Sequence, residues 1–526
     1  MRKISIFFVV MMTLIFFAGE SCKQKDVKRI EDSTLPFDST LPFDSTLIVP
    51  FFTTYPALEK YRTNLIGIYQ NYQYRHIWLD EKGIVEYGFS LHSKVKDIED
   101  DGISAEFPYQ LKIDGIFTEG SKNKLNSIDT ELLLTSLYLY YVDKVYTGID
   151  HKSTTSIGWM LPRKKVSYTD MLDSFISEDE STNEDSLILF SQYFKLRDAL
   201  KHYRKIEENG GWRPIELNPW VKNFKPNDTA RAILEVRELL FVTGDLFQNN
   251  LSDSYDADLV DAVIRYQTRN GFKPDSLILP VHIEHMNVPV GECIKSIVVN
   301  MERCRWLSPE IFLAREYIFV NIPSYELKFI RDGKTEFQSN VVVGKIMTQT
   351  VIFAGKMSYL AFSPYWNLPK NIIEEEVMPG IEKDENYLKK HNMEWNNGQV
   401  RQLPGKYNSL GLVKFMFPNS NEIYLHDTPS KKLFKEEKRA FSHGCVRVDG
   451  ARELALKILE KDENWNPEKI DEAMHADDES TYKLKQKIPV YIGYFTTWVD
   501  ELGNISFYED VYERDNRLAL LLFYKD

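Results

Sequence analysis

The chain has 526 residues, and its 43% hydrophobic and 27% charged residues are typical of folded rather than disordered protein. At about 150 residues per domain, this length predicts roughly three domains. The formal net charge of −13 argues against a nucleic-acid partner, which usually requires a basic face. The four cysteines, Cys22, Cys293, Cys304 and Cys445, are too few for a disulfide framework.

The first 22 residues have the layout of an export signal. Arg2 and Lys3 precede an apolar run at 4–19, which is shorter than the about 20 residues of a membrane span. Cys22 follows, as in a bacterial lipoprotein signal in which the cysteine is acylated, although Glu20 departs from that pattern. We therefore expect export to the periplasm and attachment to a bacterial membrane through lipid on Cys22 or an N-terminal anchor. An ordinary cleaved signal is the alternative.

Residues 23–50 are predicted to be a flexible tether. The sequence D-S-T-L-P-F occurs at 32–37 and again at 38–43, and D-S-T-L returns at 44–47. A repeat this short, rich in proline, serine and acidic residues, cannot build a core.

The spacing of apolar residues predicts two helical regions within residues 51–290. From 51 to 225, apolar residues recur every three or four positions, which indicates a mostly helical scaffold. From 226 to 290, helices are predicted at 229–241 and 258–270, each closed by a glycine, and they indicate a small helical module.

Residues 291–526 are expected to form a mainly-β domain. A helix at 291–306 comes first, and at 1.5 Å per residue it would hold Cys293 and Cys304 roughly 16 Å apart, too far for a disulfide. The pattern then changes to strands, and about sixty residues, 364–422, separate two neighbouring strands. We interpret this insertion as a capping subdomain, because long insertions at strand ends are commonly lids. The predicted fold class is α+β multidomain.

The best candidate for a reactive residue is Cys445, in the sequence S-H-G-C-V-R-V at 442–448. A thiol ionises near pH 8.5, so a cysteine nucleophile needs a proton acceptor beside it and donors for the oxyanion. His426 and His443 both titrate near neutral pH in ordinary surroundings. His426 ends a separate strand in I-Y-L-H-D-T-P at 423–429, so folding can bring it against the sulfur. We assign His426 as base and later acid.

The residues beside Cys445 are assigned supporting roles. Ser442 and His443 are expected to support the oxyanion or the substrate, because His443 is too near Cys445 in sequence to be placed freely. Gly444 permits a tight bend, so that the amide N–H groups around Gly444 and Cys445 can point at an oxyanion. Arg447 adds a fixed positive charge that favours the thiolate and can hold a substrate carboxylate.

Two other interpretations are open for this cysteine. His426, Asp427, His443 and Cys445 are all zinc-ligand types, but zinc sites rarely place a glycine next to the cysteine and an arginine two residues on. Alternatively, Cys445 is a buried structural residue and the histidines are hydrogen-bonded polar groups.

The two motifs resemble the active-site signature of the L,D-transpeptidases, whose catalytic domain is of the YkuD type. N-M-E-R-C-R-W-L at 300–307, Y-W-N-L-P at 365–369 and K-F-M-F-P-N at 414–419 resemble the larger, YcbB-like branch of that family. That branch joins a helical scaffold, a peptidoglycan-binding-like module and a β-sandwich catalytic domain with a capping subdomain. Residues 226–290 resemble such a module, which implies three helices, except that Ser276 and Leu277 replace its usual glycine-rich turn.

The resemblance implies a reaction. Cys445 would be the nucleophile and His426 the proton acceptor, and the thiolate would attack the third residue of a peptidoglycan stem peptide and release D-alanine. A diamino-acid side-chain amine of another stem would then take the acyl group, without metal or cofactor. Carbapenem-type β-lactams would be inhibitors. The alternatives are an L,D-carboxypeptidase, attachment of a protein or a D-amino acid to the wall, and a non-catalytic wall-binding lipoprotein.

Overall fold

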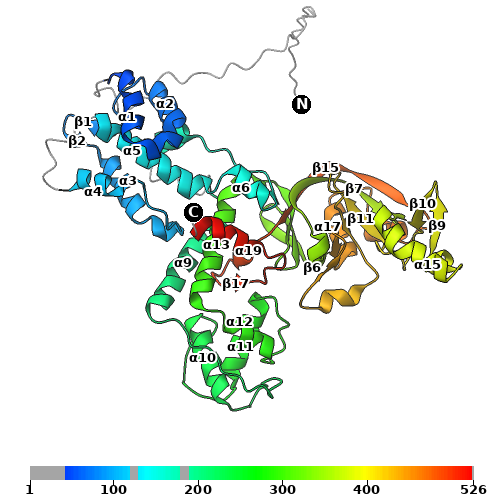
Figure 1. Cartoon of the computed structure of the whole chain (residues 1–526). Helices are drawn as coiled ribbons and strands as arrows, with labels where there is room; N and C mark the ends of the chain where they lie inside the picture. The colour runs from blue at the N-terminus through cyan, green and yellow to red at the C-terminus, as the bar shows by residue number, and fades with distance from the viewer. Residues whose placement is uncertain (1–41, 119–127, 178–188, 524–526) are drawn as a thin grey trace, which may run out of the picture.

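The computed structural model describes residues 42–118, 128–177 and 189–523 (Figure 1). The predicted signal with Cys22, and the predicted tether as far as residue 41, lie outside the described residues. Within the described ranges, no helix is both long and apolar enough to cross a membrane.

Helical structure begins inside the segment predicted to be a tether. Asp44 accepts a hydrogen bond from the Thr46 N–H at 2.9 Å and caps a 3-10 turn, η1 (Ser45–Leu47), which α1 (Ile48–Thr54) follows. The predicted boundary at residue 50 therefore lies too late. The reason is that the last repeat runs into I-V-P-F-F, whose Phe51 and Phe52 enter the scaffold core.

The scaffold is built around α5 (Ile128–Val142), which is buried on every side along nearly its whole length. Its buried carboxylate, Glu131, accepts hydrogen bonds from the Ile77 N–H at 2.6 Å, the Trp78 N–H at 3.1 Å and the Tyr69 hydroxyl at 2.8 Å. These donors satisfy a charge that would otherwise be costly to bury. The other described scaffold helices are α2 (Arg62–Asn71), α3 (Glu86–Lys96), α4 (Gln110–Phe117), α6 (His151–Ser156), α7 (Tyr168–Ser177) and α9 (Gln192–Glu208). Short elements complete it: η2 (Pro56–Tyr61), β1 (Leu79–Asp80), β2 (Gly83–Ile84), η3 (Ile98–Asp101), η4 (Asp143–Thr147) and β3 (Trp159–Met160).

Three helices form a separate module with its own core: α10 (Arg231–Val242), α11 (Ala257–Arg269) and α12 (Pro280–Met286). Asp256 caps α11 by accepting the Leu259 N–H at 3.0 Å. Ile215 and Phe224 belong to this core, so the module begins before the predicted residue 226. Arg269, the last residue of α11, forms a buried ion pair with Asp245 at 2.6 Å.

Helix α13 (Val290–Trp306) lies between the scaffold and the mainly-β domain (Figure 1). A buried ionic network at its C-terminal end joins the two. Arg305 is 1% exposed and donates to Glu302 at 3.0 Å and to the Val145 carbonyl, in the scaffold, at 3.1 Å. Glu302 also accepts the Trp306 indole N–H at 2.8 Å. Arg303 pairs at 2.7 Å with Asp515 of the C-terminal helix α19 (Arg514–Phe523).

The mainly-β domain is a ten-stranded sheet in the order β11-β12-β14-β6-β5-β4-β15-β7-β3, with β13 paired to β6. Because β11 also pairs with β7, the sheet closes on itself. The α+β multidomain fold class, with a helical scaffold and a mainly-β domain, is confirmed. The strands are β4 (Glu316–Asn321), β5 (Glu326–Arg331), β6 (Lys334–Gly344), β7 (Ile352–Phe362), β11 (Val413–Met416), β12 (Leu425–His426), β13 (Ala440–Ser442), β14 (Val446–Val448) and β15 (Ser480–Gly493). Around them lie η5 (Pro309–Phe312), η6 (Ile346–Thr348), η8 (Lys431–Lys435), α17 (Ala451–Leu459), α18 (Pro467–Met474), and the pair β16 (Thr497–Val499) and β17 (Ile505–Phe507).

The predicted insertion forms a subdomain at the far end of the mainly-β domain (Figure 1). Its small core contains Leu368, Ile372, Val377 and Val400. Its elements are β8 (Trp366–Asn367), α14 (Lys370–Ile372), η7 (Ile373–Val377), α15 (Met378–Lys383), α16 (Tyr387–Lys390), β9 (Met393–Asn396) and β10 (Gln399–Gln402). The prediction that it extends to residue 422 is wrong, because β11 pairs with β7 and β12 in the main sheet.

We predict that Glu302→Gln lowers the apparent free energy of unfolding by about 3–5 kcal/mol, because it leaves the buried Arg305 without its carboxylate. Urea unfolding followed by tryptophan fluorescence measures this. Glu292→Gln is the matched control, since Glu292 pairs with Lys295 at 3.4 Å on the exposed side of the same helix. That pair is expected to contribute less than about 1 kcal/mol. Equal losses in the two variants would contradict a special role for the buried network.

Candidate active site

The candidate site lies on the outer face of three adjacent strands, β11, β12 and β14. Their inward side chains, among them Phe415, Leu425 and Val446, are fully buried, and the alternate side chains point the other way. In the register, Lys414 lies opposite His426, and His426 lies opposite Arg447. These three side chains therefore form one row across the face. Cys445 is the residue immediately before β14.

Cys445 follows a tight turn that is fixed by its own hydrogen bonds. Gly444 has φ +119°, which a residue with a side chain rarely adopts. The Gly444 N–H donates to the Ser442 hydroxyl at 3.1 Å, and that hydroxyl donates to the Cys445 carbonyl at 2.6 Å. The Gly444 amide is thus engaged within the turn. In the described chain the Cys445 N–H has no such acceptor, so it is the better candidate for an oxyanion donor.

The turn is also held from below by Thr350. Its hydroxyl donates to the Gly444 carbonyl at 2.8 Å and accepts the Gly344 N–H at 2.9 Å. The Tyr512 hydroxyl, from the C-terminal region, accepts the Thr350 N–H at 3.1 Å and donates to the Gly344 carbonyl at 2.8 Å. All four backbone groups are buried, so the position of the turn is strongly determined.

The Cys445 thiol is half-buried and faces the Glu422 carbonyl, with Sγ 3.8 Å from that oxygen. Burial raises the pKa of Cys445 above its ordinary value, and hydrogen bonds with Tyr424 and the charges of Lys414 and Arg447 partly offset the effect. Cys445 is therefore a neutral thiol at neutral pH in the resting protein, although the surrounding charges favour the thiolate as it forms.

His426 is buried, and its Nδ1 lies 2.5 Å from the Asp427 carbonyl oxygen. A carbonyl can only accept, so Nδ1 carries the proton and Nε2 keeps the lone pair that a general base needs. Burial, followed by the positive charge of Arg447, lowers the pKa of His426 to about 3. The expectation that His426 titrates near neutral pH is wrong, because the fold buries it in a positively charged row.

Asp427 does not have the surroundings of a metal ligand. Its carboxylate pairs with Lys431 at 2.5 Å and accepts the Leu412 N–H at 3.0 Å. A Cβ at Gly411, where φ is +63°, would lie 2.3 Å from the same carboxylate. Among the described residues, no three His, Cys, Asp or Glu side chains gather as a metal site would require.

His443 faces the inserted subdomain rather than the sulfur. Its side chain is 45% exposed, and its Nε2 lies 3.9 Å from a carboxylate oxygen of Glu376 in η7. The insertion thus reaches the turn that carries Cys445. Arg447 is half-buried, and its Nε has no hydrogen-bond partner among the described residues.

Lys414, Tyr424 and Thr350 also belong to the site, although none of them is among the residues predicted from the sequence. Lys414 falls in the predicted insertion, whereas the structure places it in β11. With β11 recognised as a strand, alternation places Lys414 on the outer face. Tyr424 lies two residues before His426 and so shares its face, a signal that was available in the sequence. No local pattern indicates Thr350.

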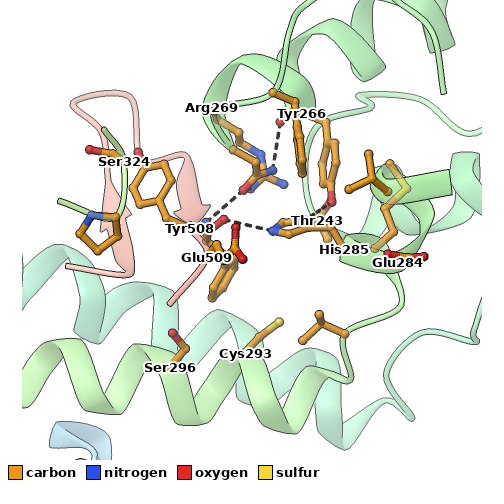
Figure 2. A pocket seen from close by; sticks show the side chains of 18 of the residues that line it. Thr243, Tyr266, Arg269, Glu284, His285, Cys293, Ser296, Ser324, Tyr508 and Glu509 are labelled. Carbon is orange, nitrogen blue, oxygen red and sulfur yellow. Dashed lines mark hydrogen bonds between the residues drawn. The ribbon is translucent and has the colours of Figure 1, made fainter. Parts of the chain in front are cut away.

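A cavity of about 400 Å³ lies elsewhere, where the three-helix module meets α13 and the β4–β5 turn (Figure 2). It is lined by Cys293 and by aromatic side chains such as Tyr266 and Tyr508. Burial raises the pKa of Cys293 to about 12, so this thiol is inert at neutral pH. His285, which also lines it, hydrogen-bonds the Phe507 carbonyl at 3.0 Å, so its ring links module to catalytic domain.

Known families match two parts of the chain. Residues 315–470 match the family model of the YkuD L,D-transpeptidase catalytic domain, and residues 63–200 match that of a scaffold domain. A curated protein of Haemophilus influenzae with a provisional L,D-transpeptidase name is 34% identical over 224 residues, which are 39% of this chain and 45% of that protein. The chain thus matches less than half the length of this relative.

Several solved structures are also similar. An L,D-transpeptidase of Xylanimonas cellulosilytica is 12% identical, with 52% of this chain and 100% of that chain covered and a TM-score of 0.18. One from Stackebrandtia nassauensis is 15% identical, with 52% and 95% covered and a TM-score of 0.21. Mycobacterium tuberculosis L,D-transpeptidase 3, in complex with a faropenem-derived adduct, is 13% identical, with 34% and 60% covered and a TM-score of 0.18. These scores are too low to support a comparison of folds, so the family match rests on the sequence.

The site predicts a particular pH dependence for the reactivity of Cys445. The thiol pKa is raised and His426, with a pKa of about 3, stays neutral, so no thiolate–imidazolium pair exists at neutral pH. The rate of alkylation by iodoacetamide is therefore expected to rise about tenfold per pH unit from pH 6 to 8. Mass spectrometry of the Cys445 peptide measures it, with Cys445→Ala as the background. A rate that is level between pH 5 and 8 would reveal a preformed ion pair and contradict the prediction.

Proposed function

We propose, from the premise that residues 315–470 are an L,D-transpeptidase catalytic domain, that this chain is a peptidoglycan L,D-transpeptidase with Cys445 as its nucleophile. The observation that carries the assignment is the row formed by Lys414, His426 and Arg447 beside a half-buried thiol. That row supplies a proton acceptor of fixed tautomer and positive charge where a negative charge develops.

The first half of the reaction forms an acyl-enzyme. Cys445 Sγ attacks the carbonyl carbon of the third stem residue while Nε2 of His426 takes the thiol proton. Because both groups begin neutral, the proton moves as the carbon–sulfur bond forms. The oxyanion takes a hydrogen bond from the Cys445 N–H. When the tetrahedral intermediate collapses, the C–N bond breaks, and the imidazolium gives its proton to the departing amine of D-alanine.

The second half transfers the acyl group. The neutral side-chain amine of a diamino acid in another stem attacks the thioester, and His426 accepts the proton that this amine loses. The C–S bond then breaks, and the sulfur recovers a proton from the imidazolium. The product is a new amide between two stems, and the enzyme returns to its resting state. Every proton and bond in this scheme is accounted for by Cys445, His426, the donor stem and the acceptor stem.

The low pKa of His426 has a mechanistic benefit in this scheme. An imidazolium at neutral pH would have no lone pair, and burial between two cations prevents that state. A low pKa also makes His426 a weak base. Lys414 and Arg447 compensate for this weakness by stabilising the thiolate and the oxyanion as they form. Charge is therefore stabilised in the transition state more than in the ground state.

Three parts of the proposal extend beyond the matched domain. The acceptor is proposed to be a stem amine, with water, a protein or a D-amino acid as alternatives. Membership of the YcbB-like branch is supported by the same order of scaffold, three-helix module and catalytic domain. Export and a lipid on Cys22 are proposed from the N-terminal sequence alone.

We predict that Cys445→Ala abolishes release of D-alanine and cross-linking. Purified protein is incubated with muropeptides and the products are identified by mass spectrometry. Wild type should give dimers linked between third residues, and Cys445→Ala no change. Cys293→Ala, which removes the inert thiol in the cavity, is the matched control and should retain activity. Full activity in Cys445→Ala would end the proposal, and trimmed monomers without dimers would make the enzyme a carboxypeptidase.

We also predict that carbapenem-type β-lactams acylate Cys445. The strained lactam carbonyl resembles the attacked amide and opens onto the sulfur, so intact-protein mass spectrometry should find one whole inhibitor mass added to wild type. No adduct is expected on Cys445→Ala. An adduct that persists in that variant would place the reactive group elsewhere.

A further inference from the structure

Two cations on the outer face of the sheet lack an anionic partner. Lys414 and Arg447 are both half-buried and flank His426 in the same row. Among the described residues, neither forms an ion pair or hydrogen bond with a carboxylate, and the ammonium of Lys414 lies 5.5 Å from the centre of the Tyr424 ring. Removing a cation from water without a partner is costly, and burial accordingly lowers the pKa of Lys414 and of Arg447. An anion placed between the two side chains would relieve this cost.

The neighbouring acidic groups do not supply that anion. Asp427 is held by Lys431 at 2.5 Å. Glu479, just before β15, accepts the Tyr365 N–H at 2.8 Å, and its charge favours protonated Lys414 without forming an ion pair with it. Glu376 lies against His443, at 3.9 Å. The facing Cys445 is neutral at rest, and so is His426, which leaves the pair of cations open to a ligand.

We propose that Lys414 and Arg447 form a carboxylate-binding site for the free terminus of the donor stem, and that Lys414 makes a donor carboxylate a condition for efficient reaction. This inference rests on the proposed function. In a donor with one residue beyond the scissile bond, the terminal carboxylate lies only about 4 Å from the attacked carbonyl, roughly one residue along the chain. Neighbouring strands are about 4.8 Å apart, so a lysine two strands from Cys445 can reach over Tyr424 to that position.

The proposal differs from simple stabilisation of the thiolate. A cation that acted only on sulfur would favour every donor equally, whatever its terminus. A cation that binds the donor carboxylate favours the acid over the corresponding amide. The two roles are therefore separated by comparing a stem tetrapeptide that ends in a carboxylate with the same peptide ending in a carboxamide.

The experiment measures kcat/KM for release of the fourth residue from both donors, using the full chain. Wild type is expected to prefer the acid by about 10- to 100-fold, as for a hydrogen bond to a charged group. Lys414→Met should abolish the preference, so that the rates with the acid and the amide become equal. Any fall in the amide rate measures the separate effect of Lys414 on the developing negative charge. Lys414→Arg should recover part of the preference. Lys432→Met, at an exposed lysine, is the control and should behave as wild type. An unchanged acid preference in Lys414→Met would overturn the proposal.

A second measurement does not depend on turnover. N-acetyl-D-alanine should slow the alkylation of Cys445 by iodoacetamide in wild type, and N-acetyl-D-alaninamide should not. The protection should disappear in Lys414→Met. If wild type is protected but releases no D-alanine, the proposed function fails and the carboxylate site stands. If wild type releases D-alanine and neither the acid preference nor the protection depends on Lys414, only the carboxylate site fails.

Discussion

The arrangement of the molecule depends on the buried charges at the end of α13. Glu302, Arg303 and Arg305 are almost wholly buried, and they reach the scaffold on one side and α19 on the other. Breaking such a network leaves an uncompensated charge, whereas forming it brings little net stability. Its effect is therefore geometric: it permits one relative position of scaffold and catalytic domain. Hydrogen bonds from the C-terminal region then continue through Tyr512 to Thr350 and the turn at Gly444.

Within the catalytic domain, buried charges contribute to the reactivity of the site rather than to the relative position of the domains. The α13 charges are paired, whereas Lys414 and Arg447 form no ion pair within the described part of the chain and lie beside a histidine that burial keeps neutral. A paired site would be more stable, yet it would not attract a negative charge. The closed sheet maintains this unfavourable arrangement, because the three strands that carry the row are bonded to neighbours on both sides.

Strong local patterns made much of this predictable from the sequence. The helical scaffold, the three-helix module and the strands of the catalytic domain follow from periodicity, and the positions of Cys445 and His426 on adjacent strands agree with their motifs. The predictions were wrong where tertiary structure decides. Val413–Met416 is a four-residue strand that only its pairing with β7 identifies. The low pKa of His426 arises first from burial and then from charged neighbours on two other strands, and the role of Thr350 depends on a turn nearly a hundred residues later in the chain.

Gly411 stands where the inserted subdomain returns to the sheet, and Asp427 occupies the space that a side chain there would need. Asp427, which follows His426, therefore packs directly against Gly411, where the chain leaves the insertion. A side chain at Gly411 would have to displace the Asp427 carboxylate, and with it the residue that follows the proposed base. Within the described residues, the loops between β8 and β10 form no ion pair or hydrogen bond with Asp427, so the way the insertion rejoins the sheet, rather than the insertion as a whole, is tied to the position of His426.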